Sequence, residues 1–152
     1  MQTRNKIYFA SDFHLGAPNN NESIEREKKI CNWLDEISKD AEEIYLLGDL
    51  FDFWFEYKKV IPKGFERLKG KLAHLTDDGI KINLFIGNHD LWTFGYLENE
   101  LGLKIYKKPV IIKINNLIFY LAHGDGLGKG NQLFKFIKSI YQNPICQFLF
   151  KL

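Results

Sequence analysis

Residues 44–52, Ile-Tyr-Leu-Leu-Gly-Asp-Leu-Phe-Asp, join a short apolar run to a polar motif, and this pairing decides the fold of the chain. The run at 44–47 is rich in β-forming residues and has the length of a buried strand. Three other apolar runs also lead directly into polar motifs, and they occupy residues 7–10, 82–86 and 117–122. We therefore predict four strands, each of which feeds a polar loop.

Apolar residues recur at helical spacing in two segments between these runs, amid charged residues. The first set is Ile24, Cys31, Leu34 and Ile37, and the second is Phe65, Leu68, Leu72 and Leu75, with Gly79 after it. Alternation of strands and helices predicts an α/β fold with helices covering a sheet. In such sheets, binding sites form beyond the carboxyl ends of the strands, which is where the polar motifs lie.

The C-terminal third contains a predicted hairpin and a predicted helix. Runs 110–114 and 117–122 flank Asn115-Asn116, a two-residue loop that tolerates positive φ and so favours a hairpin leading to His123. From Asn131 an apolar helical face extends to residue 141, Pro144 breaks it, and a second apolar segment occupies residues 145–150. We divide the chain into residues 1–130, the main domain, and residues 131–152, the start of a helical cap.

Composition limits the classes of protein to consider. The 152 residues are 45% hydrophobic and 26% charged, enough for one domain with a core. The net charge is only +2 and the lysines are scattered, so we expect no nucleic-acid partner. Two cysteines without C-x-x-C spacing favour a reducing, cytoplasmic compartment. No apolar run has transmembrane length, so any membrane contact would be peripheral.

The polar motifs contain the ligand types of a two-metal hydrolase. Such a site needs a carboxylate shared between two cations, with imidazole and amide ligands around it and an open position for water. The motifs are Asp12-Phe13-His14, Gly48-Asp49-Leu50-Phe51-Asp52, Gly87-Asn88-His89-Asp90 and His123-Gly124-Asp125. Together they predict one shared site.

The first two motifs supply the first metal ligands. Asp12 and His14 project to the same side of an extended segment, so they can hold one ion. The alternative is that Asp12 caps a helix and His14 is a half-buried residue of a turn. Gly48 lets the backbone approach the ions closely, which leaves Asp49 as the bridging ligand. Asp52 is a distal ligand or has a helix-start or hydrogen-bonding role, and it stays outside our ligand set.

The third and fourth motifs complete the predicted site. Asn88 offers a neutral oxygen to a cation, and His89 can protonate a leaving oxygen or stabilise charge on the phosphoryl group. Asp90 would fix the tautomer and orientation of His89; the alternative is that it caps a helix over residues 91–96. His123 follows the end of a strand, and we predict it as the fifth metal ligand. The alternative is that it is a structural residue of the core or of the sheet edge.

For His74, the glycines at 124–130 and the aromatic residues at 51–57 we predict mainly structural roles. His74, on the second predicted helix, is structural or exposed. The glycines at 124, 126, 128 and 130 match no phosphate-loop spacing, so we predict a flexible loop beside the metals. The aromatic cluster at residues 51–57 indicates core packing or a wall, with contact to an apolar substrate as the alternative.

The ordered set D-x-H, G-D-x-x-D, G-N-H-D and H-G-D resembles the calcineurin-type metallophosphoesterase superfamily, whose pattern closes with a further G-H-x-H. Residues 11–16, 47–54 and 122–128 resemble the UDP-2,3-diacylglucosamine diphosphatases of lipid A synthesis, and the similarity spans essentially the whole chain. The resemblance implies a β-sandwich flanked by helices. It also implies that water attacks the pyrophosphate of the lipid nucleotide to give UMP and 2,3-diacylglucosamine 1-phosphate.

The resemblance further implies the cofactor and the partners. Asp12 and His14 would hold one Mn²⁺, Asp49 would bridge, and Asn88 and His123 would hold the second Mn²⁺. A helical cap inserted after the H-G-D block would accept an acyl chain, and residues 133–150 resemble its start. The lipid substrate implies peripheral contact with the cytoplasmic face of the inner membrane.

Two departures from the pattern bear on activity. Enzymes of this type often have Arg where His89 stands, so its role in acid catalysis comes from the wider superfamily. His123 is the last histidine of the sequence, so the G-H-x-H pair is missing. We interpret the chain as a fragment without the final strands of its sheet, and expect it to bind Mn²⁺ poorly and to hydrolyse UDP-diacylglucosamine slowly or not at all.

Two rival functions stay open at this point. One is a metallophosphoesterase that acts on nucleic acid or soluble nucleotides. The other is an inactive remnant that serves as an interaction module through the apolar helix from Leu133. The sequence leaves the oligomeric state and the acyl-chain preference undetermined.

Overall fold

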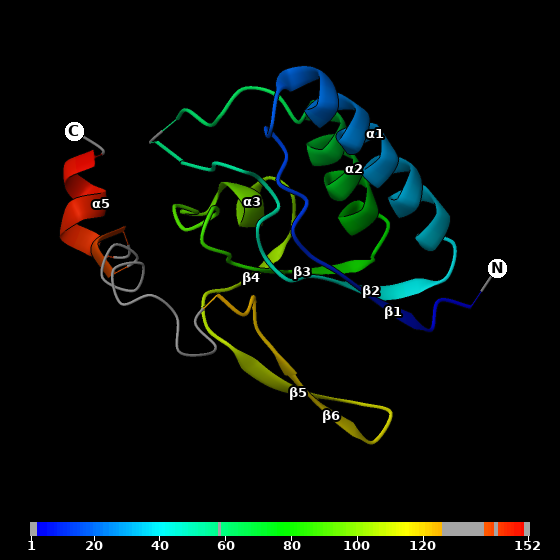
Figure 1. Cartoon of the computed structure of the whole chain (residues 1–152). Helices are drawn as coiled ribbons and strands as arrows, with labels where there is room; N and C mark the ends of the chain where they lie inside the picture. The colour runs from blue at the N-terminus through cyan, green and yellow to red at the C-terminus, as the bar shows by residue number, and fades with distance from the viewer. Residues whose placement is uncertain (1–2, 58, 126–138, 142, 151–152) are drawn as a thin grey trace.

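A four-stranded parallel sheet forms the centre of the computed structural model, which describes residues 3–57, 59–125, 139–141 and 143–150. The strands lie in the order β1 (Lys6–Ala10), β2 (Ala41–Leu46), β3 (Lys81–Phe85) and β4 (Lys104–Tyr106). Helices α1 (Asn20–Ile37) and α2 (Glu66–Asp77) cover one face of the sheet (Figure 1). The hairpin of β5 (Val110–Ile114) and β6 (Leu117–Leu121) lies against the other face. The predicted α/β class is confirmed.

Strands β1, β2 and β3 lie at apolar runs of the sequence. The runs are continuous because both faces of the sheet are covered. Strand β2 carries Ile44 towards the helices and Tyr45 towards the hairpin, and both side chains are buried. A strand covered on both faces has a continuous apolar sequence rather than an alternating one. Strand β4 was not predicted, because its three residues are too few to show a period; pairing with β3 creates it.

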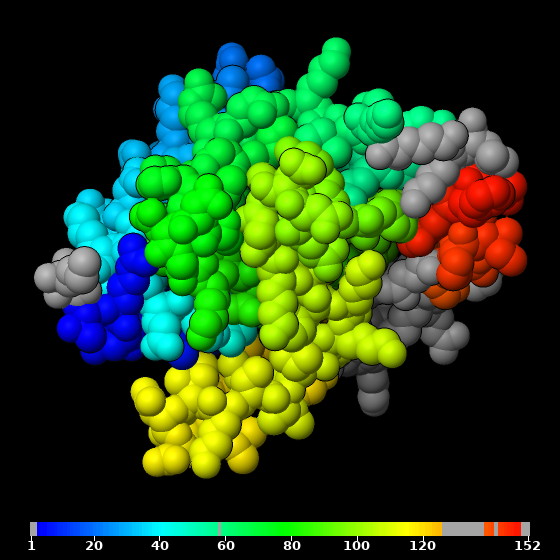
Figure 2. Space-filling view, turned by 180° about the vertical axis from the view of Figure 1, so that it is seen from behind, coloured from blue at the N-terminus to red at the C-terminus, as the bar shows by residue number. Residues whose placement is uncertain are grey.

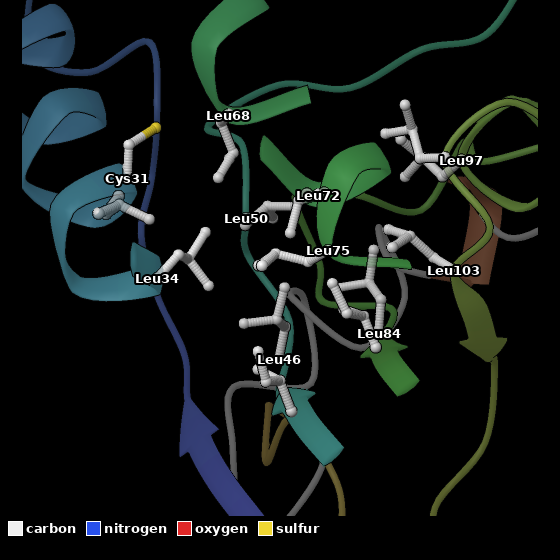
Figure 3. Packing of buried hydrophobic residues seen from close by; sticks show 14 of the residues in the cluster. Cys31, Leu34, Leu46, Leu50, Leu68, Leu72, Leu75, Leu84, Leu97 and Leu103 are labelled. Atoms are coloured by element: carbon white, nitrogen blue, oxygen red, sulfur yellow. The ribbon is translucent and has the colours of Figure 1, made fainter. Parts of the chain in front are cut away.

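The main core lies between the sheet and helices α1 and α2 (Figure 3). Leu34 of α1 and Leu72 of α2 are fully buried there, against Leu46 of β2. The buried positions of α1 and α2 recur every three or four residues, as the sequence pattern predicts. Both cysteines are free thiols.

A side chain of α1 accepts a hydrogen bond from the first turn of α2. Its N-cap residue, Phe65, has a left-handed backbone with φ of 62° and makes no side-chain capping bond. The buried Glu27 carboxylate of α1 instead accepts a hydrogen bond from the Leu68 N–H at 3.0 Å, and Arg67 Nη1 lies 3.4 Å from it. Glu27 therefore satisfies a free helix N–H and keeps its own buried charge partnered.

The predicted hairpin is also confirmed. Asn115 and Asn116 have φ of 44° and 67°, and Ile114 pairs with Leu117 across them. The inner side of the hairpin packs on a small second core of Tyr45, Phe85 and Leu121. Seen from behind, the hairpin projects beyond the sheet (Figure 2), and its outer side exposes Ile111 and Ile118.

Helices α3 (Tyr96–Asn99) and α5 (Pro144–Phe150) and a short helical stretch at residues 139–141 complete the described structure. Helix α3 follows β3, and helix α5 begins at the proline that the sequence analysis treats as a break. A proline suits the first helical position, where its missing N–H is not needed. Residues 126–138 lie outside the described residues, so the predicted helix from Leu133 stays a prediction there, whereas residues 139–141 at its end are helical. The boundary at residue 130 also stays a prediction. Within the described part of the chain, no helix has both the length and the hydropathy needed to cross a membrane.

We expect Leu72→Ala to lower the free energy of unfolding by about 2–5 kcal/mol, because it leaves a cavity between α2 and the sheet. Urea denaturation followed by circular dichroism measures this change. Leu117→Ala is the matched control, since the Leu117 side chain is 64% exposed and its loss should change the free energy by less than about 0.5 kcal/mol. Equal effects of the two substitutions would contradict the core described here.

Candidate metal site

The motifs after β1, β2, β3 and β6 meet at one place, beyond the carboxyl ends of the parallel strands. His14 Nε2 lies 3.6 Å from Asp49 Oδ2, and His123 Nε2 lies 3.3 Å from the same oxygen. The His89 backbone N–H donates a 3.0 Å hydrogen bond to Asp49 Oδ1. Each of the other three motifs thus contacts the carboxylate of Asp49.

Asp49 is the buried centre of this cluster. Its carboxylate is almost fully enclosed, and its backbone has φ of 52°. Burial alone would raise the pKa of this carboxyl, but hydrogen bonds from His123 and from the His89 N–H outweigh burial and lower the pKa. Asp49 therefore stays ionised in the protein interior and offers a negative charge to a cation.

Two glycines make room for the cluster, for different reasons. A Cβ atom on Gly87 would collide with the Asp49 carboxylate. A Cβ atom on Gly48 would lie 2.5 Å from His123 Nδ1, and the φ of Gly48, 96°, is one that side chains disfavour. Gly48 is predicted to let the backbone approach the ions closely; instead, the ring of His123 occupies the space beside it.

His123 is oriented by the end of β2. Its Nδ1 lies 2.8 Å from the Leu47 carbonyl oxygen, and its Nε2 lies 3.2 Å from Asn88 Oδ1. The hydrogen bond with Asp49 is the main reason that the pKa of His123 rises to about 9. The structure thus brings together Asp49, Asn88 and His123, which the resemblance assigns to one ion.

His14 lies between three carboxylates. Its Nε2 is 3.8 Å from Asp12 Oδ1 as well as close to Asp49, while its Nδ1 is 3.4 Å from Asp52 Oδ1. A carboxylate behind the second ring nitrogen is a common way to orient a metal-binding histidine. No helix starts at Asp52, so the helix-start interpretation is wrong, and the structure favours the hydrogen-bonding role.

The structure corrects the role predicted for Asp90. This carboxylate is 1% exposed, and its oxygens accept hydrogen bonds from the N–H groups of Leu50 at 2.9 Å and Phe51 at 3.2 Å. It therefore holds the loop after Asp49 instead of orienting His89. Burial raises the pKa of Asp90 to about 7, against the opposite effect of the two N–H groups. The alternative helix over residues 91–96 is also wrong, because a regular helix begins only at Tyr96.

His89 takes its orientation from Asp52. Its Nδ1 lies 2.5 Å from the Asp52 carbonyl oxygen and 3.7 Å from Asp52 Oδ1, and its ring meets that of His14 edge to face at 4.8 Å. No pattern in the sequence indicates this contact, because the partner is a backbone carbonyl whose position only the loop conformation determines.

Two groups of side chains at this site fit a divalent cation. One group is His14, Asp49 and His89, and the other is Asp12, Asp49 and His123; in each, the ligand atoms lie within 4.8 Å of one another. Asp49 belongs to both groups. The neighbours that the resemblance implies also lie together, because His14 Nε2 is 3.8 Å from Asp12 Oδ1 and His123 Nε2 is 3.2 Å from Asn88 Oδ1. Carboxylate and imidazole ligands together suit a divalent transition metal.

A cavity of about 400 Å³ opens beside His89. Its lining is Asp52, Phe53, Trp54, Asn88, His89, Leu91, Trp92 and Tyr141. The lining therefore combines polar residues of the metal site with aromatic side chains. Trp92 Nε1 donates a 2.9 Å hydrogen bond to the Tyr141 carbonyl oxygen, which ties the segment before α5 to this wall.

The aromatic cluster, His74 and the glycine-rich segment are the remaining features that the sequence singles out. The aromatic cluster at residues 51–57 divides: Phe51 and Trp54 are core residues, whereas Phe53 is exposed at the cavity. His74 is exposed, as predicted. The glycines at 126, 128 and 130 lie outside the described residues.

These features define a candidate divalent-metal site, the class of site found in metal-dependent hydrolases. No family model matches the chain. The UDP-2,3-diacylglucosamine hydrolase of Porphyromonas gingivalis is 38% identical over 148 residues, which cover 97% of this chain and 56% of that protein. The proteins of the same name from Actinobacillus succinogenes and Pseudomonas aeruginosa PAO1 are 25% and 28% identical over 96% and 91% of this chain.

The resemblance that the motifs indicate is therefore confirmed by curated homologues. The chain spans little more than half the length of these relatives, 56–60% in the three cases. Among solved structures, the crystal structure of the protein of unknown function AQ665 from Aquifex aeolicus matches with a TM-score of 0.56 and 19% identity. The match covers 90% of this chain and 69% of that one, and it supports the fold alone.

We expect Gly87→Ala to weaken divalent-cation binding by roughly tenfold or more, because the new methyl group displaces the Asp49 carboxylate. Isothermal titration calorimetry with Mn²⁺ measures the affinity. Gly70→Ala is the matched control: Gly70 lies in α2 with open space around its Cα, so this change should leave affinity intact and stabilise the helix by about 0.5–1 kcal/mol. Unchanged binding in Gly87→Ala would argue against a site centred on Asp49.

We expect cation binding to release a proton at pH 7, and the affinity to rise with pH until about pH 9. The pKa of His123 is raised to about 9, so the ring is protonated at neutral pH and must lose its proton before Nε2 can bind a cation. Titration in buffers with different ionisation enthalpies counts the released protons. His123→Gln should abolish the release and His74→Gln should preserve it; proton uptake, or no release, would contradict the assignment of His123.

Proposed function

We propose that this chain carries the metal-binding part of a hydrolase that cleaves the pyrophosphate bond of UDP-2,3-diacylglucosamine to UMP and 2,3-diacylglucosamine 1-phosphate. The observation that carries this proposal is the convergence of three histidine-containing segments on the buried Asp49 carboxylate. The proposal takes its substrate from the name of the homologues, which the chain matches over 91–97% of its own length in the three cases given.

Two divalent cations, for which we propose Mn²⁺, would be held by Asp12, His14, Asp49, Asn88 and His123 and would supply Lewis-acid stabilisation of the phosphoryl oxygens. Asp49 supplies a charge that both ligand groups share. Asn88 contributes its neutral side-chain oxygen, which lies beside His123 Nε2.

His89 is the proposed proton donor. Its Nδ1 donates a hydrogen bond to the Asp52 carbonyl oxygen, so the ring has a proton at Nε2 to give to a substrate only in its doubly protonated form. Transfer of that proton to the leaving phosphate oxygen would neutralise its developing charge. Asp90 acts at a distance by holding the loop that follows Asp49, as a positioning residue.

The cavity beside His89 supports a lipid-linked substrate. Asn88 and His89 line it together with Phe53, Trp54 and Trp92, so both a polar headgroup and an apolar chain would meet suitable side chains there. We propose that the calcineurin-like β-sandwich is the complete form of this fold, with the β5–β6 hairpin as part of its second layer. We also propose that the chain acts in the cytoplasm at the inner membrane, because Ile145, Phe148 and Leu149 expose apolar surface on α5.

The test is release of UMP from UDP-2,3-diacylglucosamine in the presence of Mn²⁺, followed by chromatography. We expect slow release that Asp49→Asn reduces by more than the roughly 10–100-fold that loss of an outer partner of a metal ligand costs. Asp77→Asn is the matched control, because Asp77 is exposed at the far end of α2.

Two results would contradict this function. Faster hydrolysis of bis(p-nitrophenyl) phosphate or DNA than of the lipid nucleotide would favour a phosphoesterase of soluble substrates. No hydrolysis of any phosphoester with any divalent metal, together with unchanged behaviour of Asp49→Asn, would favour a binding module.

A further inference from the structure

The segment between β1 and α1 has an unusual backbone at both of its proposed metal ligands. Asp12 and His14 have φ of 56° and 43°, in the left-handed region that side chains disfavour. Their N–H groups donate hydrogen bonds to the carbonyl oxygens of Gly48 and Asp49, both at 3.0 Å. These bonds tie one side of the segment to the loop after β2, but they leave its carbonyl groups to be satisfied elsewhere.

The carbonyl groups of this segment converge on one side chain of α1. Arg26 Nη1 lies 2.9 Å from the His14 carbonyl oxygen, 3.1 Å from that of Ala17 and 3.2 Å from that of Phe13. A charged donor makes these hydrogen bonds stronger than neutral ones. One turn earlier on the same helix, the buried Ser23 Oγ accepts a 2.8 Å hydrogen bond from the Gly16 N–H.

We propose that Arg26 is the positioning residue of the Asp12-x-His14 motif: its guanidinium holds the left-handed backbone that places both side chains beside Asp49. The proposal rests on the metal site of the proposed function, and it adds a residue that lies outside every cation-binding group described above. The two side chains that Arg26 positions lie together, with His14 Nε2 3.8 Å from Asp12 Oδ1, and each belongs to one of the two groups that share Asp49.

The geometry distinguishes this role from that of an ordinary surface arginine. The partners of Arg26 are three backbone oxygens of one short segment, so its charge compensates the dipoles of that segment in particular. Two of those oxygens belong to Phe13 and His14, within the motif itself. Loss of the charge would take this donor from the partly buried carbonyl groups, of which that of His14 would keep the 3.3 Å hydrogen bond from the Ala17 N–H, and would free the backbone to leave the left-handed region.

The experiment compares Arg26→Met, Arg26→Lys and Lys29→Met in the 152-residue chain. Methionine keeps an apolar stem without a donor, lysine restores a cation with three donors, and Lys29 is an exposed neighbour on the same helix. Electron paramagnetic resonance of free Mn²⁺ measures affinity, amide hydrogen exchange followed by NMR measures opening of the segment, and thermal denaturation measures the Tm.

We expect Arg26→Met to weaken Mn²⁺ binding by roughly 10–100-fold, the usual cost of removing a partner that orients metal ligands. The amides of His14 and Leu15 should exchange faster, while those of β3 should be unchanged. Arg26→Lys should recover part of the affinity, and Lys29→Met should match the original chain. An affinity and exchange pattern unchanged in Arg26→Met would overturn the proposal, as would equal acceleration of exchange throughout the sheet.

Further outcomes separate this proposal from the proposed function. If the original chain binds Mn²⁺ but releases no UMP, the function fails while the affinity comparison still tests Arg26. If the original chain does not bind Mn²⁺, the exchange of His14 and Leu15 decides: local acceleration in Arg26→Met supports the proposal, and no change overturns it. If Arg26→Met does not fold, Arg26→Lys decides, since weaker binding or faster local exchange at an unchanged Tm supports the role and identity with the original chain overturns it.

Discussion

The buried carboxylate of Asp49 is the constraint on which the rest of the structure depends. A carboxylate taken out of water must be compensated, or it takes up a proton and loses its charge. Here His123 and the His89 N–H supply that compensation, and His14 lies close by. Each partner follows a different strand, so the compensation requires those strands to be assembled first. The chemistry of the site and the folding of the sheet are therefore linked through one side chain.

The loops of the site are held by side chains from elsewhere in the sequence that bond to backbone groups. Asp90 binds two N–H groups after Asp49, and Arg26 binds three carbonyl groups around His14. Glu56, also buried, accepts hydrogen bonds from the Trp54 indole and from the N–H groups of Phe94 and Tyr96 at the aromatic wall. Buried loop backbone needs such partners because it has no helix or sheet to satisfy it. Rigid placement of metal ligands follows from the same bonds.

Much of the fold is predictable from the sequence, because its signals are local. The apolar runs that become β1, β2, β3 and β6 are continuous, and the two helices have a clear period. Asn115-Asn116 tolerates the positive φ that a tight hairpin requires. Strand β4 escaped prediction because a three-residue strand has no period and exists only through its neighbour. The ligand types and their order along the chain are equally local, so the motifs alone indicate a metal site.

Composition and spacing along the chain are enough to indicate the α/β class, the main elements and the residue types at the site, because these features are local. The contacts between the side chains exist only in the folded chain. The tertiary structure brought Asp12, His14, His89 and His123 around Asp49, bonded the Asp90 carboxylate to the backbone after Asp49, and placed the ring of His123 in the space over Gly48. It also connected Arg26 to the Asp12-x-His14 segment. These contacts depend on the directions of side chains and carbonyl groups in loops, and those directions are set by packing between segments distant in sequence.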